Sequence, residues 1–358
     1  MKIVFDAFWW VNGPPSQRRI LREIVMTWAE RYPADELTVV TRKKHAPDRP
    51  DDLPPGVKAV NSGLYPQAFL ARWAVPRQAR RLKADAVITH NFAPRYAGTS
   101  AIFLHDVLFS TNPEWFERKE RAYFALMPRW AKSADIVFTS SASEAHRIET
   151  VTRHPNVRPV GIGLSTELLE GTDEDIPPGL SSGRFILTVG RLNARKNLGN
   201  AIVGALHSGR VSPEFPVVVA GAANGLGEEL PAAVQEAVSV GSVVFLGHVS
   251  DAALRWLYRN CALFVFMSLG EGFGMPPMEA LASGARVLVS DLPIMRENVG
   301  EFGYYSSPTD VAQIARDIGA SLDTPSGQDI TALQLHLAPN HWASVVEKMR
   351  AALAEVKK

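Results

Sequence analysis

Short apolar runs alternate with longer amphipathic stretches along the whole chain, and this alternation restricts the fold more than any other feature. The apolar runs are rich in Val, Ile and Phe, which is typical of buried strands in parallel sheets. The amphipathic stretches between them have the length of crossover helices. The sequence therefore predicts the α/β class, built from repeated β-α units.

The strand candidates form two series, separated by an acidic, Pro- and Gly-rich segment at residues 170–179. The first series has strands at 2–6, 37–41, 86–90, 101–105 and 136–140, and helices at 17–31 and 114–133. The second has strands at 185–190, 216–220, 243–247, 263–267 and 286–290, and a terminal helix follows at 342–356. A chain of 358 residues exceeds what one hydrophobic core usually serves, so two domains are expected.

The two series predict two Rossmann-like domains with parallel sheets that face a central cleft. We expect an N-terminal domain over 1–168, a linker over 169–183 and a C-terminal domain over 184–338. The terminal helix within 339–358 is expected to pack back on the N-terminal domain. Ligands in open α/β sheets bind outside the carboxyl ends of the strands, so site residues are sought directly after each strand.

Composition excludes several classes of function. The chain has 38 Lys plus Arg against 37 Asp plus Glu, so no global field favours nucleic acid. The single cysteine, Cys261, rules out an internal disulfide and is expected to be a small core residue in a reducing cytoplasm. No segment approaches the roughly 18 to 20 apolar residues of a membrane-spanning helix, and the start is unlike a secretory signal. We expect a cytoplasmic protein, or one bound peripherally at the inner membrane face.

The most informative segment is residues 268–284, where a glycine loop joins a buried strand to a helix that begins near Pro276. The glycines let backbone N–H groups approach a ligand, and the helix start favours an anion such as phosphate. Glu271 and Glu279 would repel phosphate, so they are better suited to accept hydrogen bonds from hydroxyls. A sugar nucleotide has both kinds of group, although a surface loop with acidic residues near a helix start explains the same pattern.

A second segment, residues 189–198, places three cations in the loop after the first strand of the second series: Arg191, Arg195 and Lys196. Preplaced cations stabilise a departing diphosphate without a metal. A solvated basic surface is the alternative.

Two strand ends in the N-terminal half carry further candidates. His105 and Asp106 end one strand, where a histidine could contact a reacting sugar or accept a proton, and His90 ends another. Gly13, in the loop after the first strand, lets the backbone reach a ligand. Purely structural roles explain these residues as well.

Residues 73–83 combine basic and apolar side chains and offer a contact with anionic lipid head groups, although Pro76 weakens the helical interpretation. A plain solvated basic face is the alternative.

Together these segments resemble glycosyltransferase family 4, a retaining family with the GT-B arrangement of two Rossmann-like domains. The resemblance covers nearly the whole chain and is strongest over residues 184–305. Its most specific part is a pair of glutamates with seven residues between them, here Glu271 and Glu279. One departure is Asn12-Gly13-Pro14-Pro15, where the family commonly has paired glycines, and another is Arg286, where a proline is common.

The resemblance implies roles for individual residues. Glu271 would hold the donor sugar, together with the backbone of Gly272, Phe273, Gly274 and Met275. Glu279 would bind the nucleotide ribose, Arg191 and Lys196 the diphosphate, and His105 would lie beside the donor sugar. The reaction implied is front-face transfer with retention, in which the leaving phosphate helps to remove the acceptor proton.

No metal or other cofactor is expected. Asp173-Glu174-Asp175 looks like the metal-binding motif of another glycosyltransferase fold, but it lies in the linker, and we interpret it as solvated charge. The expected function is transfer of a hexose, mannose from GDP-mannose being favoured, to a glycan or lipid-linked glycan.

Two alternatives stay open: a sugar-nucleotide epimerase of the same build, and a non-catalytic sugar-nucleotide-binding subunit. An NAD-dependent oxidoreductase should show Gly-x-Gly-x-x-Gly after a first strand, and neither series begins that way.

Overall fold

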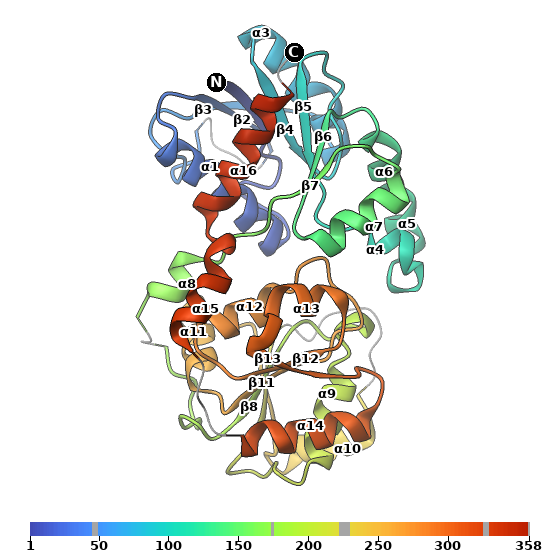
Figure 1. Cartoon of the computed structure of the whole chain (residues 1–358), viewed down its shortest axis with the longest axis vertical. Helices are drawn as coiled ribbons and strands as arrows, with labels where there is room; N and C mark the ends of the chain where they lie inside the picture. Colours follow the sequence, from blue (N-terminus) through green and yellow to red (C-terminus); the bar gives the residue numbers. More distant parts are fainter. Residues whose placement is uncertain (45–48, 173–174, 222–229, 325–328, 357–358) are drawn as a thin grey trace. The chain divides into compact units, whose positions relative to one another are not determined.

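The structure, a computed structural model, describes residues 1–44, 49–172, 175–221, 230–324 and 329–356. The chain divides into two compact units (Figure 1). Unit 1 comprises Met1–Gly163 and Ala338–Lys358, and unit 2 comprises Leu164–Leu337. Each unit contains one parallel β-sheet with helices on both faces, which confirms the predicted α/β class with two Rossmann-like domains.

The sheet of unit 1 has seven strands in the order β3-β2-β1-β4-β5-β6-β7. Their bounds are β1 Lys2–Asp6, β2 Glu36–Arg42, β3 Lys58–Ser62, β4 Ala86–His90, β5 Thr99–Phe103, β6 Ile136–Thr139 and β7 Val157–Pro159. The sequence does not predict β3 and β7. The strand order reverses between β1 and β4, and loops diverge at such a point to leave room for ligands.

The helices of unit 1 differ from expectation in two places. Their bounds are α1 Pro15–Arg31, α2 Gln67–Phe69, the π-helix η1 Leu70–Ala74, α3 Val75–Leu82, α4 Leu108–Thr111, the 3₁₀ turn η2 Pro113–Trp115, α5 Arg118–Phe124, α6 Leu126–Ala131 and α7 Ala142–Thr152. The single helix predicted over 114–133 is therefore wrong: Glu117 and Glu120 form a capping box that starts a new helix at Arg118. Pro76 does not prevent a helix, because α3 continues directly from the π-helix η1, which already departs from the hydrogen-bond pattern that a proline would interrupt.

The terminal helix α16, Trp342–Glu355, packs against α1 in unit 1. Its buried side chains include Val345, Met349 and Leu353. Arg350 donates from Nε to Oδ2 of the buried Asp35 at 2.8 Å, and the N-terminal ammonium pairs with the same carboxylate. This ion pair ties the end of the chain to its beginning.

The sheet of unit 2 has six strands in the order β10-β9-β8-β11-β12-β13. Their bounds are β8 Ile186–Val189, β9 Val217–Ala220, β10 Val243–Gly247, β11 Leu263–Phe266, β12 Val287–Ser290 and β13 Gly303–Ser306. The order reverses between β8 and β11, which pair directly through Leu263–Ile186 and Phe264–Leu187. The loops after these two strands therefore leave the sheet side by side.

The helices of unit 2 cover both faces of its sheet (Figure 1). Their bounds are α8 Thr166–Glu170, the 3₁₀ turn η3 Ala194–Lys196, α9 Leu198–His207, α10 Ala232–Ser239, α11 Asp251–Asn260, α12 Met275–Ala282, α13 Pro293–Val299, the 3₁₀ turn η4 Gly300–Phe302, α14 Val311–Asp323 and α15 Ile330–Leu337. Helix α14 packs on α9, and α12 packs on α11 and α13. The core between sheet and helices contains Ile186, Val219 and Leu263, with Ile202 and Ile318 from α9 and α14.

The boundary between the units lies earlier than the sequence suggests. Unit 1 ends at Gly163 rather than at residue 168, and α8 belongs to unit 2. The reason is the buried Arg255 on α11, whose guanidinium donates to the carbonyl oxygens of Leu168 and Thr172. Part of the predicted linker is thus attached to unit 2.

Among the residues that the structure describes, no helix is both long enough and apolar enough to cross a membrane.

Candidate functional site

Two loops meet at the reversal point of the sheet in unit 2. Residues 190–197 follow β8, and residues 267–274 follow β11. Asn197 joins the loops, because its side-chain amide donates to the carbonyl oxygen of Met267 at 2.8 Å. The meeting point is the position where open α/β sheets bind ligands.

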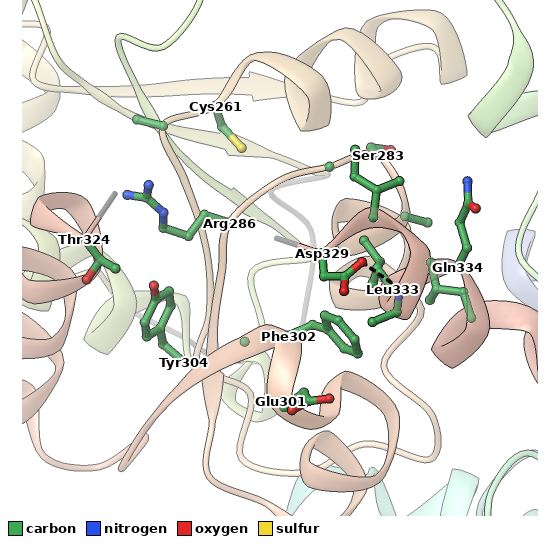
Figure 2. A pocket seen from close by; sticks show the side chains of 17 residues that line it. Cys261, Ser283, Arg286, Glu301, Phe302, Tyr304, Thr324, Asp329, Leu333 and Gln334 are labelled. Carbon is green, nitrogen blue, oxygen red and sulfur yellow. Dashed lines mark hydrogen bonds between the residues drawn. The ribbon is translucent and has the colours of Figure 1, made fainter. Parts of the chain in front are cut away.

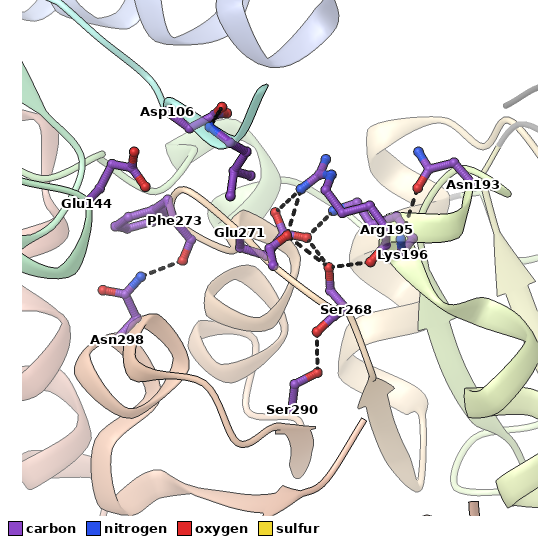
Figure 3. Close-up of polar contacts among 12 residues, drawn as sticks. Asp106, Glu144, Asn193, Arg195, Lys196, Ser268, Glu271, Phe273, Ser290 and Asn298 are labelled. Carbon is purple, nitrogen blue, oxygen red and sulfur yellow. Dashed lines mark hydrogen bonds and ion pairs between the residues drawn. The ribbon is translucent and has the colours of Figure 1, made fainter. Parts of the chain in front are cut away.

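Glu271 is the centre of this junction (Figure 3). Its Oε1 accepts from Lys196 Nζ at 2.6 Å and from Ser268 Oγ at 2.7 Å. Its Oε2 accepts from Arg195 Nη1 at 2.9 Å. Only 6% of Glu271 is exposed, so its carboxylate is buried. It forms ion pairs with two cations, Arg195 and Lys196.

The charge of Glu271 is fixed by these partners. Burial alone would raise the pKa of its carboxyl group, but the charges of Lys196 and Arg195 outweigh burial and lower that pKa to about 2. An ionised carboxylate only accepts hydrogen bonds. Glu271 is therefore suited to hold hydroxyl groups and unsuited to donate a proton.

Arg195 connects the two loops more extensively than any residue predicted from sequence. Its Nη1 also donates to the carbonyl oxygen of Gly270 at 2.9 Å, and its own carbonyl oxygen accepts from Leu269 N at 2.8 Å and Ser268 Oγ at 3.0 Å. In the sequence Arg195 is one of three cations in this loop, and the family resemblance implies diphosphate binding only for Arg191 and Lys196. In the structure Arg195 and Lys196 reach Glu271, whereas Arg191 is exposed on the same loop.

The local turn explains this difference. Asn193 Oδ1 accepts from Lys196 N at 2.9 Å and starts the 3₁₀ turn η3. That turn presents the side chains of its last two residues, Arg195 and Lys196, to the loop after β11. The sequence motif gives the spacing of the cations but does not show which of them the turn directs toward Glu271.

The glycine loop continues from Glu271 into α12. Gly274 has φ +85°, a left-handed backbone conformation that favours glycine, and a Cβ there would also displace the terminal methyl of Met295, 2.6 Å away. Phe273 is buried, and its carbonyl oxygen accepts from Asn298 Nδ2 at 2.5 Å. Helix α12 begins at Met275, and because Pro276 and Pro277 have no backbone N–H, Met275 supplies the N–H among its first three residues, beside the positive end of the helix dipole.

Glu279 lies one turn further along α12 and is 5% exposed. Its Oε2 accepts from the hydroxyl of Tyr258, on α11, at 3.2 Å. A second buried carboxylate therefore lies in the helix that follows the glycine loop. The sequence places Glu279 in this helix but gives no indication that Tyr258 contacts it.

The two remaining predicted residues, His105 and Gly13, belong to unit 1. His105 lies two residues beyond β5, and burial lowers the pKa of its imidazole to about 4, so the ring is neutral at pH 7. It stacks on His90 with ring centroids 5.7 Å apart. Gly13 lies in the loop before α1, where an added Cβ would come within 2.3 Å of the Trp9 ring.

Unit 1 also contains a buried carboxylate that the sequence does not single out. Glu144, on α7, accepts from Val107 N at 3.0 Å and pairs with Arg147. Burial raises the pKa of Glu144 to about 8 despite that pair. Its bond to Val107 fixes the segment directly after His105.

No group of three or more His, Cys, Asp or Glu side chains among the described residues is arranged to hold a metal ion. Of the acidic triplet, residues 173 and 174 lie outside the described residues, and Asp175 accepts a hydrogen bond from the Ser250 hydroxyl.

A hollow of about 1060 Å³ opens at the opposite, amino edge of the sheet in unit 2, beside Cys261, Arg286 and Tyr304 (Figure 2). This edge lies away from the strand ends where such sheets bind ligands. Arg286 has a structural role, because its Nη1 donates to the carbonyl oxygens of Ser321 and Leu322 at the end of α14. Cys261 is partly exposed before β11 rather than inside the core, so that expectation is wrong.

Comparison with known proteins agrees with this fold. Residues 174–330 match the family model of glycosyl transferases group 1. The chain is 16% identical to a solved sucrose-phosphate synthase from Thermosynechococcus elongatus, with a TM-score of 0.70 over 99% of this chain and 98% of that one. The fold is therefore that of the GT-B glycosyltransferases, and the matched segment contains both loops of the site.

Three curated relatives are mannosyltransferases. O-antigen chain mannosyltransferase B of Escherichia coli is 26% identical over 67% of this chain and 65% of its own length. A lipopolysaccharide core biosynthesis mannosyltransferase of Rhizobium leguminosarum bv. viciae is 23% identical over 95% of this chain and 91% of its own. GDP-mannose:cellobiosyl-diphosphopolyprenol alpha-mannosyltransferase of Xanthomonas oryzae pv. oryzae is 24% identical over 56% and 50%. The first match spans less than two thirds of that relative. The chain is thus similar in sequence to mannosyltransferases and has the fold of the GT-B glycosyltransferases.

Proposed function

We propose that this chain is a retaining hexosyltransferase of family 4 that uses a nucleoside-diphosphate sugar and needs no metal. The observation that carries the proposal is the junction in unit 2, where Lys196 and Arg195 flank the buried Glu271 beside the start of α12. Cations and a helix start suit a diphosphate, and an ionised carboxylate suits sugar hydroxyls. One small region thus offers the two chemistries that a sugar nucleotide requires.

Each residue of the site has a proposed role. Lys196 and the exposed Arg191 bind the diphosphate and stabilise its developing charge. Glu271 and the backbone of residues 272–275 hold the hexose, and Glu279 accepts from the ribose. His105 and Gly13 belong to unit 1, and the donor contacts that the resemblance implies for them stay predictions.

In the reaction, the bond between the anomeric carbon and the diphosphate oxygen breaks, and a bond to the acceptor oxygen forms on the same face. The acceptor proton passes to the departing diphosphate. Glu271 remains ionised throughout and positions the donor rather than attacking it.

Mannose is the sugar that we propose, and a glycan or lipid-linked glycan is the acceptor. The support is that three relatives are named mannosyltransferases and that the name of one specifies GDP-mannose with a diphosphopolyprenol-linked acceptor. GDP is therefore the expected leaving nucleotide.

The choice of nucleotide is tested by a thermal-shift panel with GDP, UDP, ADP and dTDP. We expect GDP to raise the melting temperature most, because a ligand that binds only the folded state stabilises it. A larger shift with UDP or ADP would refute the choice of GDP, and no shift with any of the four would contradict a nucleotide site.

Two other functions use the same binding groups, namely epimerisation of the sugar nucleotide and binding without catalysis. An epimerase would change the sugar without an acceptor product, and a binding subunit would leave the donor intact. The carboxylates and cations do not separate these outcomes, so product analysis must do so.

We further propose that unit 1 contacts the inner face of the cytoplasmic membrane. Tyr65, Phe69 and Trp73 are 61%, 41% and 46% exposed, and the rings of Phe69 and Trp73 lie 5.2 Å apart. Helix α3 continues from this cluster with exposed basic side chains at Arg77, Arg80 and Arg81. Adjacent aromatic and basic side chains match an interface with anionic lipid.

The membrane proposal predicts sedimentation with vesicles of phosphatidylcholine and phosphatidylglycerol but not with phosphatidylcholine alone. Trp73→Ala combined with Arg80→Ala should reduce the bound fraction several-fold, because both the apolar and the charged contact are lost. Leu335→Ala, at an exposed apolar position of unit 2, is the control. Equal binding of wild type and the double variant would refute this surface.

A further inference from the structure

Helix α13 contacts the glycine loop of the site through two side chains that lie one turn apart. Met295 packs against Gly274, and its methyl carbon lies 2.6 Å from the position that a Cβ would take there. Asn298 donates from Nδ2 to the carbonyl oxygen of Phe273 at 2.5 Å (Figure 3). Both residues are buried, so the loop rests on the inner face of this helix.

Packing alone does not explain an asparagine at position 298. The other buried residues of α13 are apolar, namely Ile294, Met295 and Val299. Asn298 is 8% exposed, and a buried amide is costly unless it is hydrogen-bonded. Its backbone is held as well, because its carbonyl oxygen accepts from His336 Nε2 on α15 at 2.6 Å. The side-chain amide is therefore fixed with its donor group directed at Phe273.

The bond to Asn298 sets the direction of the next N–H group along the loop. The peptide bond between Phe273 and Gly274 is trans, and the C=O and N–H groups of a planar trans peptide point in opposite directions. Because the Phe273 carbonyl points at Asn298, the Gly274 N–H points away from α13. Figure 3 shows Asn298 on one side of the loop and Lys196 on the other.

The Gly274 N–H is suited to a ligand. Gly274 is buried, and no described residue accepts a hydrogen bond from its N–H. Buried N–H groups are nearly always paired, so one that the chain does not pair is left for a ligand or water. Donors are few at this helix start, because Pro276 and Pro277 have none. The direction of each remaining N–H therefore matters.

We propose that Asn298 is a positioning residue that turns the Phe273–Gly274 peptide so that the Gly274 N–H donates to the hexose of the sugar nucleotide. This inference rests on the proposed function, in which the backbone of residues 272–275 holds the hexose. Glycine restricts its backbone little, so the peptide needs an outside partner to select one orientation. Asn298 acts on the donor through the loop and does not touch it.

Removing the side-chain amide tests this role. Asn298→Leu keeps a side chain of similar size but has no donor for the Phe273 carbonyl. Calorimetric titration should show that the Kd of GDP-mannose rises about fivefold, while the Kd of GDP, which has no hexose, changes less than about twofold. The kcat of transfer should fall about tenfold. A purely structural asparagine would lower the melting temperature without changing the ratio of the two Kd values.

Two further variants keep the test decisive. Asn260→Leu removes another side-chain amide of unit 2, which donates to the carbonyl oxygen of Trp256 at 2.9 Å, and should leave both the ratio and kcat unchanged. Asn298→Ser, whose hydroxyl ends one bond short of the amide, should change the ratio as Asn298→Leu does. It serves as the test if Asn298→Leu does not fold.

The outcomes separate the two levels of the proposal. If the wild type binds none of GDP, UDP, ADP and dTDP, the proposed function fails. If the wild type binds GDP and GDP-mannose but the folded Asn298 variants keep the wild-type ratio of Kd values, the role of Asn298 is refuted while the nucleotide site stands.

Discussion

Lys196→Ala is expected to lower kcat by about two to three orders of magnitude. The lysine side chain is 14% exposed and already held beside the glycine loop, so in the proposed reaction its charge would stabilise a departing diphosphate without reorganisation. The measurement is steady-state release of nucleoside diphosphate with saturating donor and acceptor. Arg191→Ala should have a smaller effect, because that side chain is exposed and its charge is screened by water.

A matched control separates catalysis from loss of charge. Arg210→Ala removes a cation from the same unit, where it pairs with Asp323 on the surface, and kcat should stay at the wild-type value. Circular dichroism must show that Lys196→Ala is folded. A folded Lys196→Ala variant with wild-type kcat would contradict the role assigned to this lysine.

Glu271→Gln is expected to lower kcat by about a hundredfold, because the neutral amide no longer holds the donor sugar in a reactive position. The same variant should also alter acid unfolding. The folded-state pKa of Glu271 is about 2 against an ordinary value of 4.5, so the stability it contributes is present above about pH 4.5. That contribution, about 3 kcal/mol, is lost as the pH falls from 4.5 to 2.

Urea unfolding between pH 6 and pH 3 measures how much the ionised Glu271 contributes to the free energy of unfolding. The wild type should lose more stability on acidification than Glu271→Gln, while both retain the acid-sensitive pair of Asp35 and Arg350. Glu236→Gln, an exposed glutamate on α10, should follow the wild type. Parallel curves for wild type and Glu271→Gln would show that the carboxylate is not stabilised by its two cations.

The central strands of both sheets could be predicted because they are buried on both faces. β4 and β12 are buried along their full lengths, and each begins with three consecutive apolar residues, Ala-Val-Ile and Val-Leu-Val. β3 at the edge of its sheet is only partly buried, and its sequence Lys-Ala-Val-Asn-Ser has no apolar run. β13, with Gly-Tyr-Tyr-Ser, was missed for the same reason.

The candidate site was less completely predictable. Glu271 and Lys196 stand out because of their spacing and their loops, and the structure brings them within 2.6 Å of each other. Arg195 and Tyr258 do not stand out, because each acts through a partner distant in sequence: 76 residues separate Arg195 from Glu271, and 21 separate Tyr258 from Glu279. Contacts of this kind depend on the fold and leave no local pattern in a single sequence.

The most direct test of the account is to incubate the protein with GDP-mannose and a lipid-linked glycan acceptor and to analyse both products. We expect one free GDP for each mannose added to the glycan, with the anomeric configuration of the donor retained, and little of either product with Lys196→Ala. An inverted linkage would contradict the retaining mechanism. An epimerised sugar nucleotide without a longer glycan would contradict transfer itself.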